Sequence, residues 1–365
     1  MKVLALVPSL YDTAPGQRFR IEQWARYLEQ DGFHFTFLSF EDQDLHEVIY
    51  QRGKYGRKVY LLACACWRRL VEASWVRAYD AVWIHREAAG LGPALVERLV
   101  ARQGVPVVYD FDDPIWLPYR SPTHGRLSCL KCPQKVAAIC RLASIVVVGN
   151  RLLARFASQH AKHVYVVPST VDLDRYRPVR PSTGGEPLTL GWTGSHSTLP
   201  FLELIRNPLR SLAATEVFRM LVISHTDRVR LDGVPVEVKA KQWRASTEAE
   251  DLQEADIALA PFPDSGWTPW RCHGKILQYM ASGIPTVASP VGMVNDYISD
   301  GVNGYLAQTD NEWSGKLTTL IREPGLRQKM GAAGREIVEQ RYSARVWAAR
   351  VGDLLKMAKD LGGRA

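Results

Sequence analysis

The uncharged stretch Ile276–Asn295, ILQYMASGIPTVASPVGMVN, decides the fold class of this chain. It is as long as a membrane-spanning helix, which needs about 20 apolar residues, but two glycines and two prolines interrupt it. Because glycine and proline end helices and strands, the stretch predicts a helix over Gly274–Ala281, a turn, and a buried strand over Thr286–Ser289. A helix that leads into a buried strand is the repeating unit of an α/β domain.

The same alternation of apolar strands and amphipathic helices runs through the whole chain. Strands are predicted at residues 2–7, 33–40, 81–85, 106–111, 144–148 and 164–168, then at 188–193, 218–224, 234–239, 257–260 and 286–289. One predicted helix begins at Leu199, and Pro208 is expected to end it. Strands that alternate with helices predict mostly parallel sheets with helices on both faces.

Residues 172–187, DLDRYRPVRPSTGGEP, interrupt this alternation with proline, glycine and few apolar side chains, as a linker does. The sequence therefore predicts two Rossmann-like domains, at residues 1–171 and 188–342, that face a central cleft. A final helix in 343–365 is expected to cross back towards the first domain. Open parallel sheets bind ligands beyond the carboxyl ends of their strands, so the cleft is the expected site.

Composition narrows the classes of protein that this chain can belong to. Its 365 residues are 46% hydrophobic and 23% charged, which excludes a small disulfide module, a coiled coil and a disordered tail. The net charge of +8 lies entirely in residues 1–180, which hold 25 basic and 17 acidic residues. This excess predicts an acidic partner, or only aids solubility. Nucleic acid is not expected, because the arginines are dispersed and no recognition motif is present.

The cysteines favour a reducing compartment. Six cysteines occur in a chain whose first nine residues do not resemble a secretion signal, so we expect a cytoplasmic protein. Cys64 and Cys66 lie in an apolar stretch and are predicted to be core. Cys129, Cys132 and Cys140 could form a zinc site with His124, but a second closely spaced pair is missing, and no metal is predicted.

Polar side chains directly follow two strands of the first domain. Asp110, Asp112 and Asp113 end the strand at 106–111, and the run His85, Arg86, Glu87 ends the strand at 81–85. Functional side chains collect at such strand ends, and crowded carboxylates can act as acid and base or bind a metal. The alternatives are a turn cap, since Asp113 precedes a proline, and a solvated loop.

Two segments of the second domain are candidates for binding phosphate. Gly194 and Ser195 follow a strand and precede a helix, where backbone N–H groups can bind an anion. Arg271, His273 and Lys275 surround the start of the helix at 274–281. Two cations at a helix N-terminus are unfavourable unless an anion lies between them, so this cluster predicts diphosphate binding. A capped helix and a solvated basic turn are the alternatives, and no dinucleotide or P-loop motif is present.

Several segments in a fixed order resemble the family 4 retaining glycosyltransferases. They are HGKILQYMASGIPTVASPVG at 273–292, DGVNGYL at 300–306, YDFDDPIW at 109–116, VVPSTVDLDRY at 166–176, LGWTGS at 190–195 and RYS at 341–343. The resemblance covers nearly the whole chain. It implies the GT-B architecture and a nucleotide-sugar donor that binds mainly to the second domain.

The resemblance also implies a diphosphate subsite, with departures. Many members place an Arg and a Lys after the strand that opens the second domain, where this chain has Gly194, Ser195 and His196. Arg271 and Lys275 are expected to supply the missing charge and to act in catalysis. Backbone groups of His273, Gly274 and Ile276 are expected beside the diphosphate, and Gly16 resembles the first-domain loop that approaches it.

Other positions differ from the family at the sugar and nucleoside. Gln278 and Trp270 replace the two glutamates of the E-x7-E motif, although a glutamine can still bond a ribose hydroxyl. Asp112 falls where many members have a histidine that contacts the transferred sugar. Trp243 and Phe262 lie where the nucleobase is enclosed, and core packing is the alternative for both.

The resemblance implies a retaining glycosyltransferase that needs no cofactor besides a UDP-sugar or GDP-sugar substrate. The acceptor is expected to be a glycan, a lipid-linked molecule or a small molecule. A nucleotide-sugar epimerase and a non-catalytic nucleotide-sugar-binding protein are the alternatives. The basic first domain predicts peripheral contact with an anionic membrane, through Arg52, Lys54, Arg57, Lys58, Arg68 and Arg69.

Overall fold

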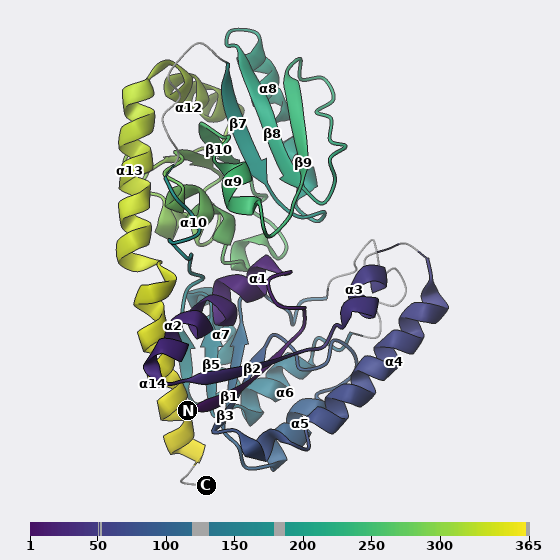
Figure 1. The fold of residues 1–365 in the computed structure, drawn as a ribbon. Coiled ribbons are helices and arrows are strands. Elements are labelled where there is room, and N and C mark those ends of the chain that lie inside the picture. The colour runs from purple at the N-terminus through teal and green to yellow at the C-terminus, as the bar shows by residue number, and fades with distance from the viewer. Residues whose placement is uncertain (50, 52, 119–130, 179–186, 363–365) are drawn as a thin grey trace. The chain divides into compact units, whose positions relative to one another are not determined.

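The computed structural model describes residues 1–49, 51, 53–118, 131–178 and 187–362 (Figure 1). Its contacts divide the chain into two units. Unit 1 contains Met1–Ser169, Trp270–Cys272 and Ala344–Ala365, and unit 2 contains Thr170–Pro269 and His273–Ser343. The cleft predicted between the two domains stays a prediction.

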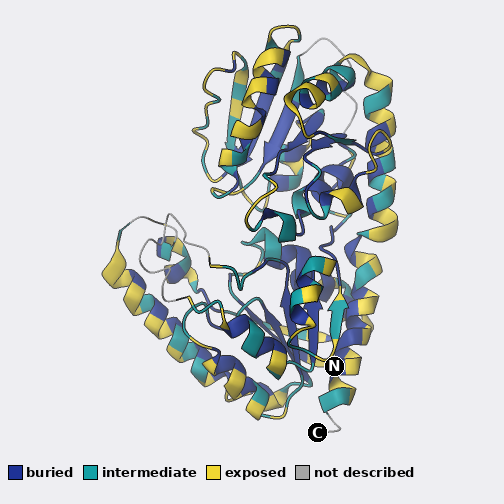
Figure 2. Ribbon diagram, turned by 180° about the vertical axis from the view of Figure 1, so that it is seen from behind, coloured by how far each residue is buried: buried dark blue, intermediate teal, exposed yellow. Residues whose placement is uncertain are grey.

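Unit 1 is built on a six-stranded parallel sheet with the strand order β2-β1-β3-β4-β5-β6. The strands are β1 (Lys2–Val7), β2 (His34–Ser39), β3 (Ala81–His85), β4 (Val107–Phe111), β5 (Ile145–Val148) and β6 (Val164–Val166). Every residue of β3, β4 and β5 is buried, as expected of a parallel sheet with both faces covered (Figure 2). In this sheet β2 lies on one side of β1 and β3 on the other. The strand order therefore reverses at β1.

Helices cover both faces of this sheet and form two hydrophobic cores with it. They are α1 (Pro15–Gln17), α2 (Gln23–Leu28), α3 (Gln43–Ile49), α4 (Tyr55–Glu72), α5 (Leu95–Arg102), α6 (Lys135–Leu142), α7 (Arg151–Ala157) and α14 (Ala344–Gly362). Asn150 begins α7, because its Oδ1 accepts a hydrogen bond from the Leu153 amide at 2.9 Å. The last helix, α14, packs against α2.

Unit 2 repeats the plan with a second six-stranded parallel sheet, in the order β12-β11-β10-β7-β8-β9. The strands are β7 (Leu188–Thr193), β8 (Phe218–Ser224), β9 (Glu237–Gln242), β10 (Ile257–Ala260), β11 (Thr286–Ala288) and β12 (Tyr305–Leu306). The strand order reverses between β7 and β10. A ligand site is expected there, beyond the carboxyl ends of these two strands.

The helices of unit 2 are α8 (Arg206–Ala213), α9 (Glu248–Leu252), α10 (Gly274–Ala281), α11 (Val294–Tyr297), α12 (Asp310–Arg322) and α13 (Pro324–Arg341). A capping box of Thr309 and Glu312 begins α12. Two glycines let α13 approach the end of α10, since a Cβ atom on Gly331 would lie 2.0 Å from the Gly283 carbonyl oxygen.

Two predictions about the chain's breaks differ from the structure. Leu199–Ile205 is a 3₁₀ helix, and Pro208 lies in the first turn of α8, where its missing N–H costs nothing, so it does not end a helix. The predicted linker is not loose where the structure describes it. Tyr176 is fully buried in the core of unit 2, while residues 179–186 lie outside the described part.

Helix α4 was not predicted, and it arranges its side chains in reverse of the usual pattern. Lys58 and Arg69 are 0% and 1% exposed, whereas Trp67 is 70% exposed and Cys64 is exposed. The prediction that Cys64 is core is therefore wrong, and neither buried cation can lie against lipid headgroups. Among the described residues, no helix is both long and apolar enough to cross a bilayer.

Candidate functional site

At the carboxyl ends of β3 and β4, the buried carboxylate of Asp110 lies between an arginine and a histidine. Asp110 lies within β4, His85 ends β3, and Arg20 lies in the π-helical segment Arg18–Glu22 that follows α1. His85 Nδ1 lies 2.7 Å from Asp110 Oδ2, and Arg20 Nε donates to Asp110 Oδ1 at 3.1 Å. All three residues are 0% exposed. Burial alone would raise the pKa of Asp110, but Arg20 and His85 lower it below its ordinary value.

The contacts of His85, Asp110 and Glu87 are relevant to their predicted role in binding the acceptor or the sugar. His85 and Asp110 are buried and bonded to each other, while Nε2 of His85 is buried without a hydrogen-bond partner among the described residues. Glu87 also has a partner inside unit 1, since its carboxylate lies 2.5 Å from Nζ of Lys135, whose side chain is 3% exposed. Contact of these three residues with an acceptor or a sugar stays a prediction.

Arg86 joins the two remaining carboxylates of the acidic run. Its Nε donates to Asp112 at 2.7 Å and its Nη2 to Asp113 at 2.8 Å. Gly16 makes room for this guanidinium, because a Cβ atom there would lie 2.8 Å from Arg86 Nη2. Burial alone would raise the pKa of Asp112, but Arg86 lowers it well below its ordinary value, so this carboxylate is ionised. Since Arg86 and Asp113 are partly exposed, this group can still meet a ligand.

The short segment Trp270–Cys272 belongs to unit 1, although the chain around it lies in unit 2. Its tryptophan ring meets Trp116 edge-on at 5.6 Å, and its carbonyl accepts a hydrogen bond from Asn150 at 2.7 Å. Cys272 Sγ occupies the space that Gly149 leaves open, since a Cβ atom on Gly149 would lie 2.1 Å from it. Burial raises the pKa of Cys272 to about 12, so its thiol stays protonated.

Arg271 has a carboxylate partner, and its role at the diphosphate stays a prediction. Its Nε donates to Asp113 at 2.9 Å, within unit 1, whereas Lys275 lies in the first turn of α10 in unit 2. The two cations predicted to share one anion therefore fall in different units, and Arg271 has a carboxylate partner. The predicted diphosphate cation that remains in unit 2 is Lys275.

Lys275 lies at the point where the strand order of unit 2 reverses. Its Nζ is 4.6 Å from the ring centre of Trp192 in β7 and 5.3 Å from that of Phe262, which follows β10. The ammonium nitrogen is itself buried. Aromatic faces attract a cation without carrying a net charge of their own. The pair of rings therefore fixes the position of the ammonium group at this end of the sheet, and its contact with a diphosphate stays a prediction.

His273, Gly274 and Ile276 of the predicted diphosphate cluster lie at or near the start of α10. His273 precedes α10 in the left-handed conformation, with φ of 48°, and its ring lies 4.2 Å from that of Phe262. Gly274 is the first residue of the helix, and the amide of Ile276 already donates to the His273 carbonyl at 3.1 Å. Phe262 is 5% exposed, so the structure favours its alternative role as a packing partner over contact with a base.

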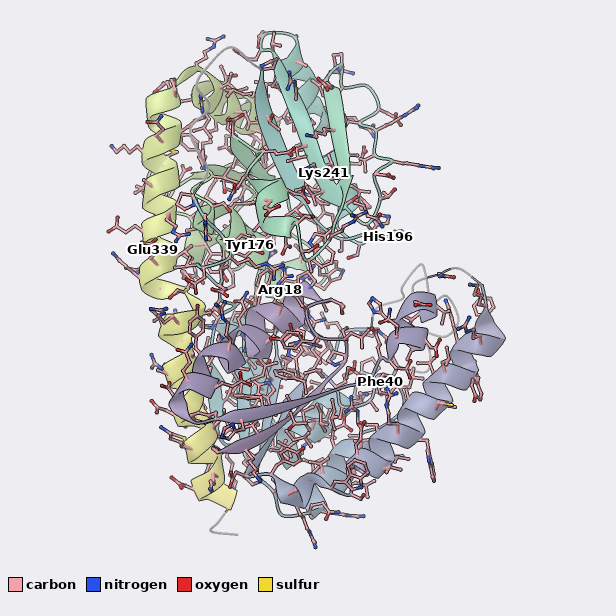
Figure 3. All side chains as sticks on the ribbon, in the orientation of Figure 1. Arg18, Phe40, Tyr176, His196, Lys241 and Glu339 are labelled. Atoms are coloured by element: carbon pink, nitrogen blue, oxygen red, sulfur yellow. The ribbon has the colours of Figure 1, made fainter. Side chains whose placement is uncertain are left out.

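The turn after β7 brings together two histidines. Gly194 is required there, because a Cβ atom would lie 2.5 Å from the Trp192 ring. Ser195 and His196 are exposed, and the His196 ring lies 4.8 Å from that of His225, which follows the neighbouring strand β8 (Figure 3). Burial and then the neighbouring His196 lower the pKa of His225. The sequence analysis missed His225, although it follows its strand as directly as His196 does.

Gln278 is part of a buried hydrogen-bond network. Its Nε2 donates to the hydroxyl of Tyr176 at 2.7 Å, and that hydroxyl donates to Glu248 at 2.7 Å. Glu248 also accepts a hydrogen bond from Trp243 Nε1 at 2.8 Å. Both Glu248 and Tyr176 escaped the sequence analysis, since they lie in a short helix and in the predicted linker. The network fixes the orientation of the Gln278 amide, the group predicted to meet the ribose.

The structure gives the predicted zinc alternative no support in its described part. No group of three or more His, Cys, Asp and Glu side chains placed to hold a metal ion occurs among the described residues. Burial raises the pKa of Cys140 to about 12, which disfavours the thiolate that zinc requires. Cys129 and His124 lie outside the described residues.

Comparisons with known proteins agree with this architecture. The sequence model of glycosyl transferases group 1 matches residues 202–323, and no curated protein sequence matches the chain significantly. Sucrose-phosphate synthase from Thermosynechococcus elongatus is 15% identical, with a TM-score of 0.70 over 98% of this chain and 99% of that one. HepE from Anabaena in complex with UDP is 16% identical, with a TM-score of 0.66 over 98% and 100%. The chain thus has the α/β GT-B fold, and these findings support a glycosyltransferase.

Proposed function

We propose that this protein is a retaining glycosyltransferase of family 4, which transfers a sugar from a nucleoside diphosphate sugar to an acceptor hydroxyl. Unit 2 binds the donor and unit 1 the acceptor. The observation that carries the proposal is the ammonium group of Lys275, held between Trp192 and Phe262 at the reversal of the strand order. It lies within the part of the chain that matches the glycosyltransferase model.

The donor diphosphate gains charge as the sugar leaves it, and Lys275 stabilises that charge. The acceptor hydroxyl attacks the anomeric carbon from the face that the diphosphate leaves. The bond from the anomeric carbon to the diphosphate oxygen breaks, the bond to the acceptor oxygen forms, and the acceptor proton passes to the departing diphosphate. A fixed cation beside the leaving group supplies its stabilisation without moving during the reaction.

The proposed donor is a UDP-sugar, with a GDP-sugar as the second choice. HepE, of similar fold, is described in complex with UDP and with UDP-glucose. In this chain Gln278 is oriented by Tyr176 and offers its amide to the ribose, in place of a carboxylate. Asp112, Asp113 and Arg86 are the candidates for contact with the acceptor or the transferred sugar. Two of these side chains reach solvent, with Arg86 29% and Asp113 19% exposed.

We also propose that the reaction needs no metal ion and takes place in the cytoplasm. A cation for the diphosphate is already present in Lys275, and the five described cysteines are all free thiols, as in a reducing compartment. Transfer is therefore expected to persist in EDTA. Restoration of activity by Mg²⁺ or Mn²⁺ after EDTA treatment would contradict the metal-independent part of the proposal.

Release of nucleoside diphosphate from a panel of nucleotide sugars, with and without acceptors, tests the function. We expect release that requires an acceptor, and a product whose anomeric configuration matches the donor by NMR. Isomerised donor without an acceptor would indicate an epimerase instead. Donor that binds in a thermal-shift assay but is never turned over with any acceptor would indicate a binding protein.

A further inference from the structure

Helix α4 of unit 1 exposes an apolar face that the sheet does not need. Its inward stripe is Lys58, Leu62, Ala65, Arg69 and Glu72, spaced three and four residues apart. The outward side chains, with those just past the helix end, are Tyr55, Val59, Tyr60, Trp67, Val71 and Trp75, which are 58%, 51%, 67%, 70%, 38% and 62% exposed. We call these six residues the α4 face.

The inward stripe explains how a helix with this pattern can pack on unit 1. Arg69 donates to Glu72 at 2.8 Å and to the Leu38 carbonyl at 3.0 Å, and Lys58 donates to the Gln51 carbonyl. Because these buried charges have partners, the helix does not need its aromatic side to form a core. The exposed residues alternate with buried ones along the whole length of α4 (Figure 2).

Exposed aromatic side chains on this scale mark an interaction surface. Monomeric proteins seldom expose large contiguous apolar patches, although single exposed apolar residues are common. On α4 the aromatic residues Tyr55, Tyr60 and Trp67 each lie four or seven residues from another member of the α4 face. The helix has 18 residues and is about 27 Å long. Tyrosine and tryptophan are enriched where one side of a ring is apolar and the other is wet.

The charges around the α4 face select the partner. Residues 54–78 contain six basic residues, of which Lys58 and Arg69 are buried, and one acidic residue, Glu72, which is buried as well. Arg57 and Arg68 lie eleven residues apart, or about three turns, and so flank the same side of the face. Their acidic partners are Asp44 and Asp42 on the neighbouring segment. Four basic side chains that reach solvent, Lys54, Arg57, Arg68 and Arg77, therefore lie beside the aromatic side chains together with these two carboxylates.

We propose that the α4 face docks this protein onto a membrane surface that contains anionic lipids, with the aromatic side chains at the level of the headgroups. An interfacial helix of this kind combines apolar burial with attraction of lysine and arginine to anionic lipid. A second copy of the chain as the occupant of this face is a separate outcome of the test below. The inference does not rest on the proposed glycosyl transfer.

Vesicle co-sedimentation of the full chain tests this proposal. We compare phosphatidylcholine vesicles with and without phosphatidylglycerol, at low and high salt. We expect binding only with the anionic lipid, weakened by salt as surface charges are screened. Trp67→Ser and Trp75→Ser should each weaken binding about tenfold, because each removes the burial of one large apolar side chain. Arg57→Gln should weaken it about fivefold, the weight of one basic residue.

Val217→Ser is the matched control, because Val217 is 78% exposed on unit 2. It should bind vesicles as the unaltered protein does, and the melting temperatures of all these variants should agree, since the side chains are exposed. Binding that does not depend on anionic lipid or on Trp67 would overturn the proposal. So would the absence of vesicle binding. A dimer in sedimentation velocity that Trp67→Ser dissociates would assign the face to a second copy instead.

Discussion

The carboxyl ends of the two sheets treat charge in opposite ways. In unit 1, Arg20 and Arg86 each bond a carboxylate, so the cations and anions largely satisfy one another. In unit 2, the Lys275 ammonium lies over two aromatic rings, and the His196 ring lies at a tilt beside that of His225. Rings do not neutralise a cation as a carboxylate does. At the ends of two similar sheets, the cations of unit 1 thus contact carboxylates, whereas Lys275 of unit 2 contacts aromatic rings.

The largest effect expected is on the stability of unit 1. Asp110→Ala leaves Arg20 as a buried charge without its carboxylate, and we expect a loss of about 3–5 kcal/mol in the free energy of unfolding. Denaturant unfolding measures it. Asp44→Ala removes the exposed pair with Arg57 and should cost about 1 kcal/mol or less. Equal losses in the two variants would break the comparison.

Acid should weaken the same contacts. The pKa of Asp110 in the folded chain lies below its ordinary value of 3.8, so its contribution to stability is present above that value and is lost as the pH falls through the folded pKa. The free energy of unfolding of the unaltered protein should therefore decrease in acid more steeply than that of Asp110→Ala. Parallel pH profiles would show that Asp110 is not the group that titrates.

A smaller effect is expected from packing at the segment Trp270–Cys272. Gly149→Ala places a methyl group where Cys272 Sγ lies, and overpacking of this kind costs about 1–3 kcal/mol. Cys272→Ala removes the sulfur, so the double variant should recover most of the loss in thermal unfolding. No recovery would mean that the segment does not pack in unit 1 as described.

The histidine pair predicts a pH dependence of donor binding. Protonated imidazoles favour an anionic donor, and burial with the neighbouring His196 lowers the pKa of His225, so more acid is needed to charge it. The KM for the nucleotide sugar should therefore rise about tenfold as the pH rises through the pKa of His225, the effect of about 1.4 kcal/mol. His225→Gln should keep the high-pH KM throughout. A pH profile unchanged by this substitution would remove the pair from the donor site.

The smallest effect is expected at Gln278. Loss of one neutral hydrogen bond weakens binding by about 0.5–1.5 kcal/mol, so Gln278→Ala should weaken nucleoside diphosphate binding about threefold to tenfold. Isothermal titration calorimetry measures it, with Gln253→Ala as the control on a surface turn. A change in kcat with an unaltered dissociation constant would place Gln278 in the chemistry instead.

Sequence patterns predicted most of the strands, because buried parallel strands are continuous apolar runs. β1, β3 and β7 begin and end at the predicted residues. β9 has few apolar residues and was placed three residues too early. Helix α4 was missed because its pattern is reversed, with charged residues inside and aromatic residues outside. No periodicity shows which face a helix buries when its buried charges have partners elsewhere in the chain.

The site was predicted where it depends on position along a strand or helix, and not where it depends on partners. The position of Lys275 at the start of α10 follows from the sequence, but the placement of Arg271 in unit 1 does not, since it depends on Asp113 far away in the chain. For the same reason the contact between His85 and Asp110 could not be predicted from their positions. The position of a residue at a strand end shows at which edge of the sheet it lies. Only its contacts show whether a charged group already has a partner of opposite charge.

Turnover by Lys275 variants tests the central claim most directly. Acceptor-dependent release of nucleoside diphosphate is measured for Lys275→Ala and Lys275→Met, the second of which keeps the space between Trp192 and Phe262 filled. Lys239→Ala, an exposed lysine on β9, is the control. We expect both Lys275 variants to lose about 10²-fold to 10³-fold in kcat, with melting temperatures near that of the unaltered protein. Turnover near the unaltered rate in a folded Lys275→Met variant would contradict the account.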